Sequence, residues 1–347
     1  MLRVMVVFGG KSGEHEVSLA SARAILETLK KSDAYEVYPV GITKEGRWLS
    51  SGDPMRELES RSSDGGSGLP APVSDKLPAN LGHADVVFPV LHGPHGEDGT
   101  IQGMLEMAGI PYVGSGVLAS AASMDKVTMK KIFAYHGLPQ VEWLGLTREG
   151  WNENREKLIR EIEDSLGYPC FVKPSNLGSS VGINKAQTSE ELAEAVDVAA
   201  ELDRRIIVEA AANAREIEVA VLGNEEPKVS VPGEIVVGSH EFYDYEAKYT
   251  AGESEVLAPA DIPEDAATEI REIARNAFKA IDAAGMARID FFLERGTDRV
   301  LLNEINTIPG FTPTSVYARL WDASGLPYKE LLDELIQLAI ERHKAKF

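Results

Sequence analysis

The sequence predicts an α/β protein of more than one domain, and three observations lead to that class. The apolar run Val4 to Phe8 is typical of a buried parallel strand. A glycine-rich turn, Gly9 to Gly13, follows it, and residues 18–30 then place apolar side chains at helical spacing. Strand, glycine turn and helix in this order begin a doubly wound α/β unit. The chain has 347 residues, which suits two or three domains better than one core.

The charge balance argues against one class of partner. Acidic residues number 55 and basic residues 35, so the formal net charge is −20. We do not expect a nucleic-acid partner, because nucleic-acid backbones bind to basic faces. ATP is not excluded, since it needs only a few basic groups placed locally.

The single cysteine and the lack of long apolar runs argue against disulfide-linked, cysteine–zinc and membrane-spanning proteins. Cys170 rules out an intrachain disulfide and a cysteine zinc site, and its neighbours indicate a buried strand thiol rather than a nucleophile. No apolar run reaches the ~18 residues that a membrane helix needs. The first 16 residues lack a signal-peptide cleavage pattern. We expect no membrane association and a cytoplasmic location.

We expect the first domain to cover residues 1–123. Strands over 37–42 and 85–91 extend the sheet, and a helix over 100–108 follows the turn after His92. His92 and Glu14 stand where doubly wound folds bind ligands, although a structural histidine and a helix-dipole carboxylate remain alternatives. Residues 51–78 are rich in Ser, Gly, Pro and Asp, so we interpret them as a surface loop or linker.

We expect the second domain to cover residues 124–211. Lys173 ends a buried strand and precedes the small-residue loop 175–182. A buried lysine needs an anionic partner, and such a loop can hold phosphate through backbone N–H groups and hydroxyls. A glycine hairpin without a ligand is the alternative. The predicted helices are 125–135, 148–166 and 190–202, and the predicted strands are 141–146, 168–172 and 206–209.

We expect the third domain to cover residues 212–347. It begins with an alternating strand over 216–222. Residues 232–257 are polar and aromatic, and a loop of that length is usually functional or mobile. Helices are predicted over 265–285 and 328–343.

The stretch 288–310 predicts a hairpin that carries a metal site. Two apolar segments flank a turn containing Gly296. Alternate side chains of a strand share a face, so Glu304 and Asn306 point the same way, and Asp290 joins them if the pairing is antiparallel. An oxygen-only ligand set suits Mg²⁺, which usually sits with phosphates. A solvated hairpin face is the alternative.

Six segments together are highly specific, and on them the chain resembles the D-alanine–D-alanine ligases of the ATP-grasp superfamily. The resemblance covers nearly the whole chain. It implies an N-terminal Rossmann-like (pre-ATP-grasp) domain followed by a two-lobed ATP-grasp fold, with ATP between the lobes. The segments are GGKSGEHEVSL (9–19), HGPHGEDGTIQG (92–103), SMDK (123–126), KPSNLGSSVG (173–182), FYDYEAKY (242–249) and ARIDFF to NEINTIPG (287–310).

The resemblance implies ATP as a substrate and two Mg²⁺, for which Mn²⁺ can substitute. The implied metal ligands are Asp290, Glu304 and Asn306. Two lysines would neutralise phosphate oxygens, the serine loop would close over them, and two glutamates would fix adenine and ribose. The implied ATP contacts are Lys126, Lys173, Ser179, Ser180, Glu209, Ala210, Ala212, Glu216 and Lys248.

The resemblance also implies contacts to D-alanine. Glu14 would hold the first ammonium with support from His92, and Arg288 with the Gly310 amide would stabilise the oxyanion. Tyr249 would link the long loop to Glu14 and Ser179 as a lid. The implied substrate contacts are Glu14, Val17, His92, Tyr249, Arg288, Gly310 and Ser315, and the implied catalytic residues are Glu14, Ser179, Arg288 and Gly310.

The implied reaction joins two D-alanines through an acyl phosphate, for peptidoglycan precursor synthesis, and the family implies a homodimer. Three alternatives stay open. The same fold could use D-lactate or D-serine as second substrate, although the segment FYDYEAKY favours dipeptide formation. The chain could be another ATP-grasp carboxylate–amine ligase. It could also be a non-catalytic nucleotide-binding protein.

Overall fold

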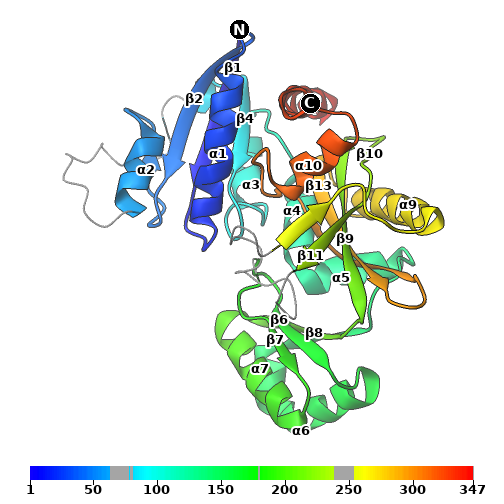
Figure 1. Ribbon diagram of the computed structural model, residues 1–347. Coiled ribbons are helices and arrows are strands. Elements are labelled where there is room, and N and C mark those ends of the chain that lie inside the picture. The colour runs from blue at the N-terminus through cyan, green and yellow to red at the C-terminus, as the bar shows by residue number, and fades with distance from the viewer. Residues whose placement is uncertain (63–77, 79–80, 179, 238–253, 347) are drawn as a thin grey trace.

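The structure is a computed structural model that describes residues 1–62, 78, 81–178, 180–237 and 254–346. Within these residues it contains three separate β-sheets with helices packed against each (Figure 1). The strand orders are β3-β2-β1-β4, β5-β8-β6-β7 and β12-β11-β9-β13-β14, with β10 paired to β9. The predicted α/β class is therefore confirmed.

The N-terminal sheet is parallel at its centre, as the sequence predicts. Strand β1 (Leu2–Gly9) pairs in parallel with β2 (Tyr35–Ile42) on one side and β4 (Val86–Val90) on the other. Strand β3 (Trp48–Leu49) adds an antiparallel edge. Helix α1 (His15–Leu29) buries its apolar stripe on this sheet, and α3 (Thr100–Met107) follows the turn after β4.

The prediction of a loop over residues 51–78 is wrong for residues 54–62, which form helix α2 (Pro54–Ser62). An Asp53 carboxylate oxygen accepts the Arg56 N–H at 3.2 Å, and Pro54 occupies the first turn, where its missing N–H does no harm. Leu58 is 2% exposed and packs against the backbone at Gly41. The Ser and Gly content of the whole segment concealed this start signal. Residues 63–77 lie outside the described part of the chain.

The central sheet is antiparallel and carries two helices on one face. It consists of β5 (Trp143–Thr147), β8 (Arg205–Ala210), β6 (Cys170–Pro174) and β7 (Asn184–Ala186). Helices α6 (Arg148–Ser165) and α7 (Ser189–Leu202) cover it (Figure 1). Cys170 is buried in this core as predicted, and burial raises the pKa of its thiol to about 11.

The third sheet faces α9 (Glu264–Ala280) on one side and a cavity on the other. It is built around β13 (Gly285–Glu294), which pairs antiparallel with β9 (Ala214–Gly223) and β14 (Val300–Asn306). Along β13, Ile289, Phe291 and Leu293 are buried against the α9 side, so the alternate residues Arg288 and Asp290 face away from α9. The predicted hairpin is confirmed.

Three further expectations for the C-terminal half need correction. Residues 232–257 are not wholly a loop, because β11 (Gly233–Val237) and β12 (Ser254–Leu257) pair at its two ends. The short edge strand β10 (Lys228–Val229) precedes them. The helix predicted over 265–285 ends at Ala280, and helix α10 (Val316–Ala323) was not predicted. Residues 238–253 lie outside the described part.

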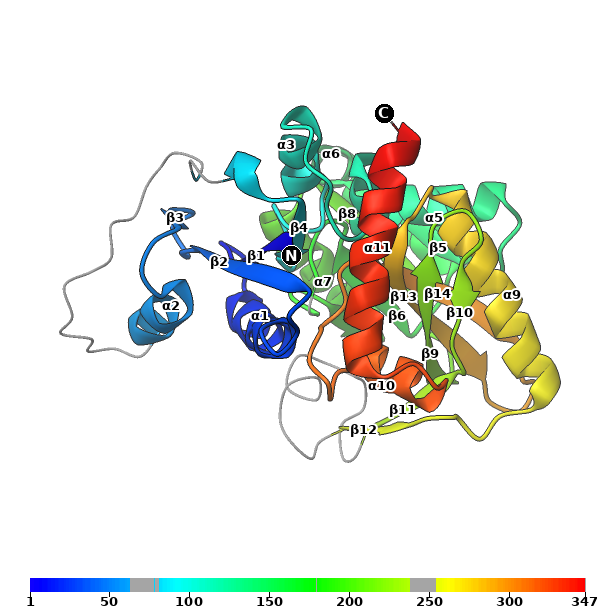
Figure 2. The ribbon, with the colours of Figure 1, turned by 90° about the horizontal axis from the view of Figure 1, so that it is seen from above.

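The last helix, α11 (Tyr328–Lys346), lies between the N-terminal sheet and the third sheet (Figure 2). Its apolar side chains join a single core that includes Val6 of β1 and Met286 of β13. Phe311 strengthens the same junction, with its ring 5.8 Å from the ring of Phe88. Because packing crosses the predicted limits at residues 123 and 211, the three-domain division stays a prediction. None of the described helices is long and apolar enough to cross a bilayer.

The helices α4 (Val117–Met124) and α5 (Lys126–Tyr135) connect the first two sheets, and a short 3₁₀ turn, Leu81–His83, precedes β4. Just before α4, Gly114 passes close to Gly285. A Cβ at Gly285 would lie 3.1 Å from the Gly114 backbone, and Gly285 has a φ of +73°. Only glycine satisfies both conditions without strain.

We therefore expect Gly285→Ala to lower the free energy of unfolding more than Gly296→Ala. Gly296 also has a positive φ, +85°, but open space where a Cβ would stand. The backbone penalty alone is about 1–3 kcal/mol, and crowding adds about 1–3 kcal/mol. Urea unfolding of both variants measures the difference. Equal losses would show that the close approach of the two backbones does not constrain the fold.

Candidate active site

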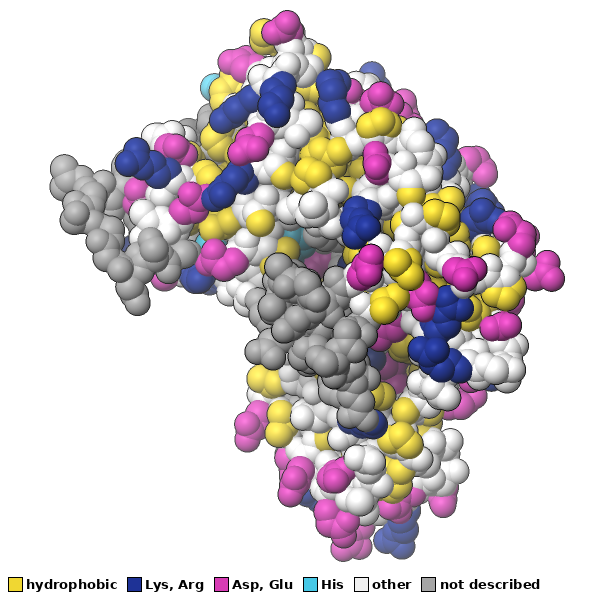
Figure 3. Space-filling model, viewed as in Figure 1, with side chains coloured by type: hydrophobic (Ala, Val, Ile, Leu, Met, Phe, Trp, Pro, Cys, Tyr) yellow, Lys and Arg dark blue, Asp and Glu magenta, His cyan; other side chains and the backbone are white. Residues whose placement is uncertain are grey.

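Two adjoining cavities lie where the three sheets meet. Figure 3 shows acidic side chains in the hollow between the lower lobe and the rest of the molecule. The first cavity lies between the central and third sheets, and the second lies between the third sheet and the N-terminal part. Both are lined by Lys126, Leu177, Gly178 and Glu304.

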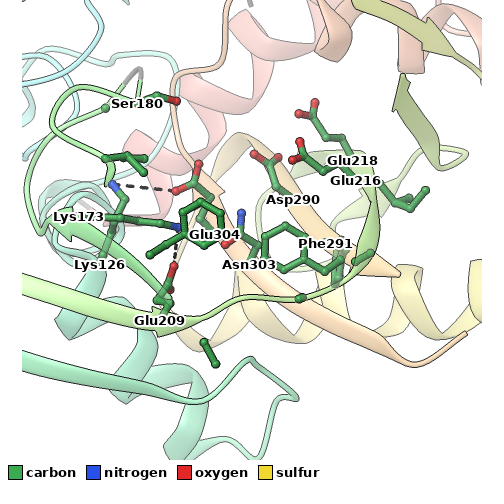
Figure 4. Close-up of a pocket in the computed structure, with 18 of the residues that line it drawn as sticks. Lys126, Lys173, Ser180, Glu209, Glu216, Glu218, Asp290, Phe291, Asn303 and Glu304 are labelled. Atoms are coloured by element: carbon green, nitrogen blue, oxygen red, sulfur yellow. Dashed lines mark ion pairs between the residues drawn. The ribbon is translucent and has the colours of Figure 1, made fainter. Parts of the chain in front are cut away.

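A row of three carboxylates crosses the third sheet at the first cavity. Asp290 on β13 stands directly opposite Glu218 on β9 and Glu304 on β14. Figure 4 shows Asp290 with Glu216 and Glu218 on one side of the cavity, and Lys126 and Lys173 on the other. The sequence predicts the face shared by Asp290 and Glu304, and the register confirms it.

Arg288 balances this row. Its guanidinium makes two bonds to Asp290, at 2.8 and 2.7 Å, and lies 3.0 Å from a Glu218 oxygen. Adjacent carboxylates repel, and a partly buried arginine between them offsets that repulsion. Arg288 lines the second cavity, whereas Asp290 and Glu218 line the first. The guanidinium therefore stands at the border of the two cavities.

Lys126 is anchored beside the small-residue loop. Its ammonium donates to the Leu177 carbonyl at 2.7 Å and lies 4.0 Å from a Glu304 oxygen. Lys126 is the first residue of α5, whose N-cap is Asp125. Lys126 thus lies at the base of the loop 175–182 that the sequence predicts to hold phosphate.

Asp125 ties this loop to the rest of the central sheet. Its carboxylate accepts the Thr128 N–H at 2.8 Å, and it contacts Arg205 at 2.6 Å and the Asn176 amide at 3.1 Å. Burial alone would raise the pKa of the Asp125 carboxyl, but these bonds outweigh it and lower the pKa. The ionised carboxylate fixes the start of the loop against α5.

The far end of the first cavity has apolar walls and a buried carboxylate. Phe171, Ile183 and Ile217 form the walls, which suit a flat ring. Glu209 lies at this end, and Lys173 on the neighbouring strand makes an ion pair with it. The predicted contacts Ala210, Ala212, Glu216 and Ser180 line the same cavity, with Ser180 at a φ of +59°.

The second cavity gathers the residues predicted to contact the amino acids. Glu14 and Val17 come from the start of α1, His92 follows β4, and Arg288 and Gly310 come from β13 and the segment after β14. Ser315 lies beside them, because a Cβ at Gly310 would lie 3.4 Å from its hydroxyl oxygen. Residues from both halves of the chain are therefore needed to build this cavity.

His92 presents a bare ring nitrogen here. Its Nδ1 donates to the Ile308 carbonyl at 2.9 Å, since a carbonyl only accepts. Burial lowers the pKa of His92 although Glu14 opposes the shift. Nε2 has no hydrogen-bond partner among the described residues. The ring is therefore neutral, with Nε2 available to accept a hydrogen bond.

Sequence reasoning missed two carboxyl groups. Glu97 is 8% exposed, lines the second cavity and accepts the Gly93 N–H at 2.5 Å. Burial, with Glu14 adding to it, raises the pKa of Glu97 to about 8. The alternation of the strand over 216–222 places Glu218 on the same face as Glu216, but its position opposite Asp290 follows from a pairing distant in sequence.

Three predicted site residues, Ser179, Lys248 and Tyr249, lie outside the described residues, so their roles stay predictions. The described residues bring no three His, Cys, Asp or Glu side chains together as a metal cluster. Asp290, Glu304 and the amide Asn306 offer oxygen donors only, which fits a hard cation that phosphate oxygens also bind.

The raised pKa of Glu97 predicts a pH-dependent stability. The pKa of a glutamate in the unfolded chain is about 4.3, and burial raises the pKa of Glu97 to about 8 in the folded chain. The folded state therefore binds more protons between these values, so this group lowers stability as pH rises through that window. We expect Glu97→Gln to flatten the loss of thermal stability between those pH values.

Thermal unfolding from pH 5 to pH 9 measures this change. Glu153→Gln, which alters an exposed carboxyl on α6, is the matched control. If Glu97→Gln and wild type lose stability with the same slope, the buried carboxyl does not titrate as inferred.

Comparison with known proteins agrees with the geometry. The family model described as "D-ala D-ala ligase N-terminus" matches residues 3–115, and "D-ala D-ala ligase C-terminus" matches residues 132–337. The D-alanine–D-alanine ligase of Bacillus cytotoxicus is 48% identical, covering 99% of this chain and 97% of the relative. That of Heliobacterium modesticaldum is also 48% identical, covering 99% and 96%.

Solved structures are similar along the whole chain. The D-alanine–D-alanine ligase of Coxiella burnetii superimposes with a TM-score of 0.83 at 36% identity, covering 100% of this chain and 97% of that chain. The VanG D-Ala:D-Ser ligase of Enterococcus faecalis gives the same score and identity, covering 97% and 99%. The predicted ATP-grasp fold is thereby confirmed, and this chain belongs to the D-alanine–D-alanine ligase family.

Proposed function

We propose that this protein joins two D-alanines into D-alanyl-D-alanine, using ATP and releasing ADP and phosphate, as a step of peptidoglycan precursor synthesis. The supporting observation is the pair of adjoining cavities that share Lys126 and Glu304. One has flat apolar walls and cations that suit a nucleotide triphosphate. The other is small and holds groups that suit an amino acid. Because the two cavities share lining residues, substrates bound in them would lie next to each other and could react.

The first cavity is proposed to bind ATP along its length. Glu209 would contact the adenine amino group, and Glu216 would contact the ribose. Lys126, which lines both cavities, and Lys173, which lines the first, would neutralise phosphate oxygens through their ammonium groups. Ala210, Ala212 and Ser180 would contact the nucleotide through their backbone or short side chains.

Asp290, Glu304 and Asn306 are proposed to hold Mg²⁺ between the protein and the phosphates. A bound divalent ion there would offset the negative charge of the triphosphate. In this structure Asp290 lines the first cavity, and Arg288 holds its carboxylate through two hydrogen bonds.

The second cavity is proposed to bind both D-alanines. Glu14 would pair with the ammonium of the first, and neutral His92 would support it by accepting a hydrogen bond at Nε2. Val17 would contact the methyl group of the first D-alanine. Ser315 would hold the carboxylate of the second D-alanine. Arg288 and the Gly310 amide would stabilise the oxygen that gains charge in the tetrahedral intermediate.

The chemistry needs no covalent nucleophile from the protein. A carboxylate oxygen of the first D-alanine attacks the γ-phosphorus, an O–P bond forms, and the bond to ADP breaks. The neutral amine of the second then attacks the acyl carbon. A C–N bond forms, phosphate leaves with the C–O electron pair, and the amine proton is lost. Water would hydrolyse the acyl phosphate, which is the reason to expect a closing lid.

The cellular setting is proposed on chemical grounds. ATP and small amino acids are the substrates, and ATP is made and held in the cytoplasm, where we propose that the enzyme acts. A homodimer remains a proposal from the family resemblance.

Two of the similar structures differ in the second substrate that their names state. The VanG D-Ala:D-Ser ligase is as similar in structure as the Coxiella burnetii protein, so similarity of fold does not separate D-alanine from D-serine. The segment 242–249 favours dipeptide formation with D-alanine, but it lies outside the described residues.

We expect purified protein to release ADP from Mg-ATP only when D-alanine is present, and mass spectrometry to find the dipeptide. D-alanine competed against D-serine and D-lactate in equal amounts decides the acceptor. If D-alanyl-D-serine or D-alanyl-D-lactate is the main product, D-serine or D-lactate is the preferred second substrate in place of D-alanine. ATP binding without D-alanine-dependent ADP release would favour the non-catalytic alternative.

We expect Glu304→Gln to lower kcat at least about 100-fold at fixed Mg²⁺, because a metal-facing carboxylate loses its charge. Raising Mg²⁺ should recover part of the rate. The control is Glu294→Gln on the same hairpin, at the end of β13 beyond the cavity lining. A kcat for Glu304→Gln equal to that of the control would remove Glu304 from the proposed metal site.

A further inference from the structure

Lys130 is a buried lysine to which the proposed function assigns no role. It is 1% exposed and lies one helical turn after Lys126 on α5. Residues four apart share a helix face, so both ammonium groups leave α5 on the side of the central sheet. Lys126 lines both cavities, whereas Lys130 lines neither. An ammonium removed from water in this way requires an anionic partner.

The partner is Glu209. The Lys130 ammonium lies 2.7 Å from one carboxylate oxygen of Glu209, and Lys173 pairs with the other oxygen (the second pair is drawn in Figure 4). Glu209 lies opposite Phe171 on β6, and Lys173 is two residues further along that strand, which makes it a diagonal neighbour on the same face. Each oxygen of this buried carboxylate therefore faces its own cation.

Two basic side chains, Lys130 and Lys173, share the single carboxylate of Glu209. Burial by itself would raise the pKa of Glu209, but Lys130 and Lys173 outweigh it and lower the pKa to about 2. The carboxylate is thus ionised at neutral pH. Burial lowers the pKa of Lys130, and the Glu209 carboxylate 2.7 Å away favours the charged form of the ammonium. Without Lys130, Glu209 and Lys173 would neutralise each other, and Lys173 would present no net charge to an anion.

We propose that Lys130 is a positioning residue that sets the preference for adenine nucleotides. By holding one oxygen of Glu209, it keeps the carboxylate directed at the exocyclic amino group of the purine, and it leaves the charge of Lys173 to the phosphates. This inference rests on the proposed function, in which Glu209 contacts adenine. Adenine presents a donor at that position and guanine presents an acceptor. A fixed carboxylate therefore favours ATP over GTP.

The first test compares Lys130→Met with Lys131→Met. Lys131 is the next residue of α5 and is exposed, so its variant controls for loss of a lysine from this helix. Binding of Mg-ATP and Mg-GTP is measured by calorimetry, and KM and kcat are measured for ATP and D-alanine. We expect Lys130→Met to weaken ATP binding about tenfold or more. The ratio of ATP to GTP affinity should fall, with KM for D-alanine unchanged.

The second test asks whether Lys130 acts through Glu209. Lys130→Met is introduced into a Glu209→Gln background, and the loss of ATP affinity is compared in the two backgrounds. We expect little further loss in the second background, because residues that act through one another are not additive. Equal losses in both would overturn the proposal, since a role in packing alone adds independently.

The proposal would also be overturned if Lys130→Met and Lys131→Met have the same ratio of ATP affinity to GTP affinity. Circular dichroism and thermal unfolding establish that each variant is folded. If Lys130→Met does not fold, Lys130→Gln, which keeps N–H donors without the charge, replaces it in both tests. The binding measurements need no turnover, so they remain readable if wild-type protein fails to release ADP with D-alanine. That failure would refute the proposed function alone.

Discussion

Repulsion between neighbouring carboxylates is the constraint on which this site depends. Glu218, Asp290 and Glu304 stand side by side on three adjacent strands, in a cavity partly closed to water. Such a row is stable only if cations are held within reach, and Arg288 and Lys126 supply them. The same arrangement prepares the cavity for a ligand that brings its own mixture of positive and negative charge, as a metal-bound triphosphate does.

Local patterns in the sequence predict much of this arrangement. The hairpin 288–306 and the shared face of Asp290 and Glu304 follow from the two-residue period of a strand, which needs no knowledge of distant partners. The glycine turn before α1 and the position of His92 after β4 follow from parallel-sheet rules in the same way. These parts could be predicted because each depends on residues close in sequence.

The parts that could not be predicted depend on distant pairing or burial. Glu218 meets Asp290 across 72 positions of sequence, so nothing near either residue signals the contact. Glu97 stands in a turn where acidic residues are usually exposed, yet the fold buries it. Lys130 resembles its exposed neighbour Lys131 in sequence, and only the position of β8 distinguishes them. Asp53 and Pro54 did carry a helix signal, which the composition of the surrounding segment obscured.

The position of α11 also has a consequence for synthesis of the chain. The N-terminal sheet is made first, but residues 328–346 complete the core beside Val6 and Leu26. Until residues 328–346 leave the ribosome, the first sheet lacks part of its apolar cover, so its surface stays open to chaperones or to other nascent chains. A chain that stops before residue 328 would leave that apolar surface uncovered, which favours aggregation.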